Sequence, residues 1–157
     1  MRMLVVGVGN DIMGDDGIGP AVIRELEASD RLPPYVDLLD EGAGGMRIIH
    51  DIEGYDRVLI IDSADFGGDP GDWKLFRPED VSTRKKITGR SLHEMDLIKT
   101  LELAKLVGNA PEDIWIMAVQ PKRVALGKPL SDEIKKRMGE YVEVILKKEE
   151  EISGEPA

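Results

Sequence analysis

Leu4-Val5-Val6-Gly7-Val8, near the start of the chain, is a short apolar run bounded by glycine. Such a run is typical of a strand buried on both faces of a sheet. Similar apolar runs follow at Val36 to Leu39, Val58 to Ile61 and Ile114 to Val119. Helical patterns separate these runs, and this alternation predicts an α/β fold in three layers. We expect a mostly parallel, twisted, five-stranded sheet with helices on both faces.

The segments between the strands carry clear helix and turn signals. A first helix is expected around Pro20, where Ile18, Val22, Ile23 and Leu26 form one apolar stripe. A second covers Met46 to Glu53, Trp73 to Phe76 suits an edge strand, and the polar stretch from Pro78 to Arg90 suits a mobile surface loop.

Two further helices are expected in the second half of the chain. Ser91 and Glu94 form a capping box for a helix to about Val107. Its expected core stripe is Met95, Ile98, Leu101 and, at its end, Leu106. Ser131 is expected to cap a single last helix that buries Ile134, Met138, Tyr141, Val142 and Ile145 on one face.

Length, charge and composition narrow the classes of function. The 157 residues suit one domain over residues 1–148, followed by a frayed, flexible acidic tail over 149–157. The net charge of -10 argues against a nucleic-acid partner, which requires a basic surface. The absence of cysteine excludes disulfides, thiolate metal sites and cysteine nucleophiles. With no membrane-spanning run and no signal peptide, we expect a cytoplasmic protein, most simply a monomer.

Polar residues gather where the strands are expected to end. In α/β sheets, ligands bind beyond the carboxyl ends of the strands, which places Asp16, Asp40, Asp62 and Gln120 on one rim. His93 lies in the first turn of its helix, where the positive end of the dipole favours a neutral imidazole. We therefore predict that Asp16, Asp62 and His93 converge as a candidate catalytic and metal site. Two carboxylates and one imidazole suit nickel, zinc or manganese and leave coordination positions open.

Other interpretations of the same residues remain open at this point. Asp15 is best explained as an acid that interacts with a helix dipole, and Asp16 suits capping and ligation equally well. Asp62 could instead bind loop backbone amides. Gly7-Val8-Gly9 suggests dinucleotide binding, but Ile12 stands where the third glycine belongs, so two glycines that only form a tight turn explain the motif well.

Several segments in fixed order form a more specific pattern. They are Val5-Val6-Gly7-Val8-Gly9-Asn10, Asp15-Asp16-Gly17-Ile18-Gly19, Asp40-Glu41-Gly42-Ala43, Ile60-Ile61-Asp62-Ser63-Ala64, Ser91-Leu92-His93, Val119-Gln120-Pro121 and Leu126-Gly127 with Leu130-Ser131. By these segments the chain resembles the hydrogenase maturation endopeptidases from Arg2 to about Lys148. It departs from them mildly where a glycine is commoner than Glu41 and a threonine commoner than Ala43.

The resemblance implies an activity, a partner and a metal. It implies an endopeptidase that removes the C-terminal extension of the large subunit of a nickel–iron hydrogenase. The precursor carries the nickel, and the protease senses that ion through Asp16, Asp62 and His93. The ion could polarise the scissile carbonyl or supply hydroxide, or it could serve only in recognition while Asp16 or Asp62 activates water. The alternatives are a non-catalytic nickel-binding checkpoint or carrier, and a small nucleotide-binding module.

Overall fold

The computed structural model describes residues 1–42, 47–82, 92–108 and 110–154, with the backbone alone at 81–82, 92–96 and 152–154. Within these ranges one sheet is formed by β1 Met3–Val8, β2 Val36–Gly42, β3 Arg57–Ser63, β4 Trp73–Phe76 and β5 Asp113–Val119. The helices are α1 Ile18–Ser29, α2 Ile48–Asp51, α3 Pro78–Ser82, α4 Leu92–Val107, α5 Asp132–Lys135 and α6 Met138–Gly154, and a 3-10 turn, η1 Gly14–Gly17, precedes α1.

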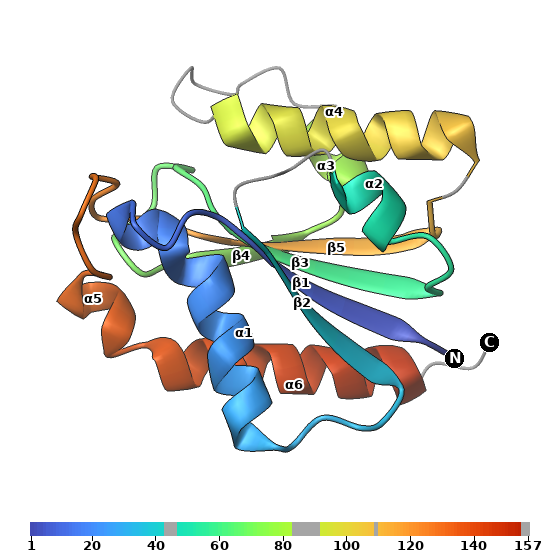
Figure 1. Cartoon of the computed structure of the whole chain (residues 1–157), viewed down its shortest axis with the longest axis horizontal. Coiled ribbons are helices and arrows are strands. Elements are labelled where there is room, and N and C mark those ends of the chain that lie inside the picture. The colour runs from blue at the N-terminus through green and yellow to red at the C-terminus, as the bar shows by residue number, and fades with distance from the viewer. Residues whose placement is uncertain (43–46, 83–91, 109, 155–157) are drawn as a thin grey trace.

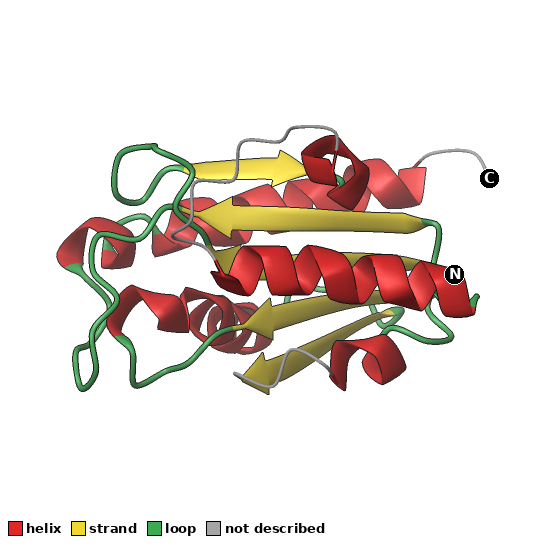
Figure 2. Cartoon of the chain, turned by 90° about the horizontal axis from the view of Figure 1, so that it is seen from above, coloured by secondary structure: helices red, strands yellow, loops and turns green. Residues whose placement is uncertain are grey.

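The sheet has the strand order β2-β1-β3-β5-β4, and only the pairing of β4 with β5 is antiparallel. The parallel strands therefore end at one edge, toward which their arrows point in Figure 2. β4 runs the other way and begins at that edge, because Trp73 pairs with Val119 at the end of β5. The predicted mostly parallel, five-stranded α/β sheet is confirmed.

Successive strand residues pack into two separate cores on the two faces of the sheet. Val5 and Ile61 pack with residues of α1 and α6, whereas Val6 and Ile60 pack with residues of α2 and α4. Figure 1 shows the same three layers, with α1 and α6 on one side of the sheet and α2, α3 and α4 on the other. The alternation follows from the two-residue period of a strand.

Gly19 sets the position of α1 against the strands. A Cβ atom on Gly19 would lie 2.4 Å from the Val8 carbonyl oxygen and 2.6 Å from that of Ile61. A larger residue would therefore push the start of α1 away from β1 and β3. This close contact holds η1, which immediately precedes α1, over the carboxyl ends of both strands.

The predicted last helix is wrong in its continuity and in its cap. It is divided into α5 and α6, because the amide of Arg137 bonds to the carbonyl of Ile134 with the tighter spacing of a turn. Ser131 makes no side-chain hydrogen bond to cap α5; its hydroxyl donates to Asp15 instead.

Three other expectations need correction. Pro78–Ser82 is helical rather than loop, while 83–90 lie outside the described residues. Leu106 is 86% exposed, because it lies well off the helix face that carries buried Leu101 and Ala104. α6 continues through the expected tail to Gly154, since Glu149 is buried and accepts a hydrogen bond from the hydroxyl of Tyr35.

No helix in the described part of the chain combines the length and the apolar character needed to cross a bilayer.

Candidate active site

Buried polar side chains concentrate at the carboxyl ends of the parallel strands. Among the described residues seven polar or charged side chains are buried, and five lie at this end of the sheet, between 0% and 8% exposed: Asp15, Asp16, Asp62, Ser63 and Gln120. Burying polar groups costs free energy unless their hydrogen bonds are satisfied. Their concentration at the edge where α/β folds bind ligands marks it as the candidate site.

Ser63 connects the two predicted carboxylates. Its hydroxyl donates to Oδ1 of Asp16 at 2.8 Å, and its amide donates to Oδ1 of Asp62 at 2.8 Å. Asp16 comes from η1 and Asp62 from the end of β3, so one residue orients acids from two elements. Asp16 does not cap α1, because the N-cap residue is Gly17 and no side chain forms a capping hydrogen bond there. The capping interpretation is therefore wrong.

The turn after β1 closes onto Asp16. Gly9 has a φ of 141°, and a Cβ atom there would lie 1.9 Å from the Asp16 carbonyl oxygen. The amide of Asn10 donates to Oδ2 of Asp16 at 3.0 Å, and the amide of Gly9 donates to the Gly42 carbonyl. These amides are therefore not available to a pyrophosphate. The glycines serve the tight turn, which argues against the nucleotide-binding alternative.

His93 is the second residue of α4, and the structure describes its backbone but not its side chain. The predicted cap at Ser91 also lies outside the described residues. α4 begins at the end of the molecule to which the parallel strands point (Figure 1). Asp62 shares a strand face with Ile60, which packs on the α4 side. Among the side chains that the structure describes, no three metal-ligating groups form a metal site. The convergence of Asp16, Asp62 and His93 stays a prediction.

Asp15 has a role that the sequence did not indicate. Its buried carboxylate accepts hydrogen bonds from the amides of Lys122, Arg123 and Ser131 and from the Ser131 hydroxyl, at 2.6 to 3.0 Å. It thus fixes the segment 121–131 beside η1. The predicted role in a helix dipole does not describe these contacts, and local sequence carries no signal for partners more than 100 residues away.

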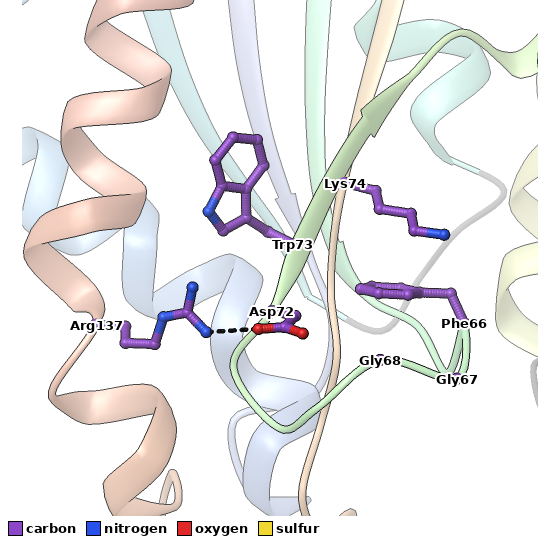
Figure 3. A pocket seen from close by; sticks show the side chains of 7 residues that line it. All are labelled: Phe66, Gly67, Gly68, Asp72, Trp73, Lys74 and Arg137. Atoms are coloured by element: carbon purple, nitrogen blue, oxygen red, sulfur yellow. Dashed lines mark hydrogen bonds and ion pairs between the residues drawn. The ribbon is translucent and has the colours of Figure 1, made fainter.

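Gln120 orders the chain that follows Asp62. Its Oε1 accepts from the amides of Phe66 and Gly68, and its Nε2 donates to Asp65. This loop borders a pocket of about 300 Å³ whose lining includes Phe66, Trp73, Lys74 and Arg137. Figure 3 shows Arg137 directed at Asp72, with Lys74 on the side of Phe66.

Comparisons with known proteins identify the family of the chain. The family model described as hydrogenase maturation protease matches residues 20–148. The chain belongs to the hydrogenase maturation protease family. The family description and several relatives name proteases or endopeptidases, and the resemblance inferred from the motifs is therefore confirmed.

Individual relatives support the same assignment. The chain is 33% identical over 125 residues to the Escherichia coli K12 hydrogenase 2 maturation protease, covering 78% of this chain and 74% of that protein. The structure of the E. coli hydrogenase maturating endopeptidase HybD superposes with a TM-score of 0.84 at 29% identity, covering 98% and 94%. Some curated relatives are longer: at 30% identity the match covers 78% of this chain but 60% of HoxM from Cupriavidus necator.

Proposed function

We propose that this protein removes the C-terminal extension from the nickel-loaded large-subunit precursor of a nickel–iron hydrogenase. The nickel belongs to the substrate, and Asp16, Asp62 and His93 sense it. The names of the relatives support hydrogenase maturation by proteolysis. The observation that carries the assignment of the site is the Ser63 link, which holds two buried carboxylates of the family motifs at one end of the sheet.

The donor set fits an ion presented by another molecule. Each oxygen of Asp16 accepts one hydrogen bond and, as a carboxylate oxygen, has a second lone pair for a ligand. Two carboxylates and one imidazole also leave coordination positions for the ligands with which the precursor already holds its nickel. This shared coordination would allow the protease to distinguish loaded from empty precursor.

The same carboxylates can serve the hydrolysis. A water molecule attacks the scissile carbonyl carbon, and Asp16 or Asp62 accepts its proton as general base. The proton then passes to the leaving amide nitrogen, the C–N bond breaks, and the tail departs as a peptide with a free amine. Ser63 orients both acids for this step through its two hydrogen bonds.

The direct test incubates the protein with nickel-loaded and nickel-free precursor and follows loss of the tail by mass spectrometry. Cleavage of the loaded precursor alone supports the proposal. Binding without cleavage favours the checkpoint or carrier, and equal cleavage of both forms removes the sensing role of nickel.

Two variants test the residues. Asp62→Asn and His93→Ala should keep the fold, measured by circular dichroism, and lose cleavage. Asp56→Asn is the matched control, because Asp56 is exposed just before β3 begins, at the opposite end of the strand from Asp62. Its carboxylate accepts a hydrogen bond from the amide of Arg2. Full activity in Asp62→Asn, or an unfolded His93→Ala, would remove that residue from the site.

A further inference from the structure

Two adjacent loops at the carboxyl end of the sheet expose large apolar side chains. Ile12 is 59% exposed on the loop of residues 10–14, and Val124 and Leu126 are 49% and 71% exposed on the segment 121–131. Exposed apolar side chains that cluster are typical of interaction sites. We call these three residues, together with Arg123 and Lys128, the two-loop surface.

Backbone hydrogen bonds join the two loops into one unit. The amide of Gly127 donates to the Ile12 carbonyl at 2.7 Å, and the amide of Gly14 donates to the Lys128 carbonyl at 3.0 Å. The buried carboxylate of Asp15 holds the same segment at three amides. The surface is therefore formed before any partner arrives, which lowers the ordering cost of binding.

The charge of the surface indicates the chemistry of its partner. The segment 121–131 contains three cations and no carboxylate, in a chain with a net charge of -10. Lys122 pairs with Glu133 at 3.0 Å, but Arg123 and Lys128 are exposed and form no ion pair with any residue that the structure describes. A partner that matches this surface combines apolar side chains with acidic ones.

The location indicates which molecule that partner is. The loop of residues 10–14 leads directly into η1, which carries Asp16, so a molecule bound to the two-loop surface lies beside the candidate site. We propose that the two-loop surface docks the precursor itself, through an apolar segment flanked by acids and separate from the bond that is cut. This proposal rests on the proposed function and assigns part of its substrate specificity.

The experiment compares two double variants of equal chemistry. Val124→Ser/Leu126→Ser removes apolar side chains from the two-loop surface. Leu103→Ser/Leu106→Ser removes side chains that are 45% and 86% exposed toward the far end of α4, and it is the control. Binding is measured with nickel-free precursor, which the proposed function leaves uncut, and kinetics with nickel-loaded precursor.

The first double variant should weaken precursor binding about tenfold, the loss typical of removing apolar anchors. KM should rise by a similar factor while kcat stays unchanged, and the control should match the wild type. Arg123→Gln/Lys128→Gln should weaken binding and reduce its dependence on salt concentration. This charge variant also keeps the proposal testable if the serine variant does not fold.

Three results would overturn the proposal. The first is unchanged precursor binding in both two-loop variants. The second is an equal loss of precursor binding in the Leu103→Ser/Leu106→Ser control. The third is that the wild type forms a dimer, which the variants dissociate without any effect on precursor binding. The last would assign the surface to a second copy of the chain. If the wild type binds precursor through this surface but never cleaves it, the proposed function fails and the docking surface stands.

Discussion

Asp15→Asn tests the most heavily bonded buried carboxylate of the site region. Oδ2 of Asp15 accepts from the amides of Lys122 and Arg123 and from the Ser131 hydroxyl, and Oδ1 accepts from the Ser131 amide at 2.6 Å. Asparagine keeps the shape, but its amide nitrogen must face at least one of these donors. It also removes the charge that strengthens the remaining bonds.

The magnitude follows from these contacts. An orphaned buried donor costs about 1–3 kcal/mol, and a hydrogen bond to a neutral acceptor is weaker than one to a charged acceptor by about 1 kcal/mol. Because the donors are partly buried, we expect a loss of about 3 kcal/mol. For a chain of this size that corresponds to a fall in Tm of about 6–12 °C.

The assay is thermal unfolding followed by circular dichroism, with hydrogen exchange at the amides of Lys122, Arg123 and Ser131. Asp11→Asn is the control, since Asp11 is an exposed acid paired with Arg24 on the surface, where such pairs contribute little. A Tm for Asp15→Asn close to that of the control, with unchanged exchange at those amides, would refute the reasoning.

Three further predictions concern stability. Tyr141→Phe should lower the free energy of unfolding in urea by about 1 kcal/mol, because the buried hydroxyl donates to a backbone carbonyl at 2.7 Å; no change would mean that this bond is not stabilising. Burial raises the pKa of Glu41 from 4.5 to about 7, so between these two pH values the folded state binds more protons than the unfolded state. The free energy of unfolding should therefore fall as pH rises through this range, and Glu41→Gln should flatten its dependence on pH. An unaltered slope in Glu41→Gln would contradict a contribution of Glu41 to this dependence. Deleting 149–157 should lower Tm, because Glu149 is buried and bonded to Tyr35; an unchanged Tm would restore the expectation of a frayed tail.

The strands and the first helix could be predicted because their burial leaves a local pattern. Strands buried on both faces give continuous apolar runs, as at Val58 to Ile61, and α1 repeats its apolar residues at helical spacing. The order of strands and helices then predicts that Asp16 and Asp62 lie at one edge of the sheet. The contacts of Ser63 are consistent with that placement.

The errors arose where tertiary contacts decide local structure. The break between α5 and α6 contains no glycine or proline; it lies at Arg137, whose guanidinium bonds Asp72 and Glu140. The neighbours of Asp15 in sequence suggest a helix-dipole role, but its hydrogen-bond partners lie more than 100 residues away in the chain. Such contacts leave no periodic signal, so sequence patterns could not predict them.

The reversed direction of β4 has a consequence for how the molecule can meet a polypeptide. If β4 were parallel to the other strands, the chain after β3 would have to cross back to the opposite end of the sheet before β4 could begin. Because β4 begins at the end of the sheet where β3 stops, residues 64–72 connect the two strands without returning to the opposite end. They stay beside Gln120 at the candidate site. The reversed direction of one strand therefore keeps this connection at the end of the sheet that carries the candidate site, where a bound polypeptide would meet it.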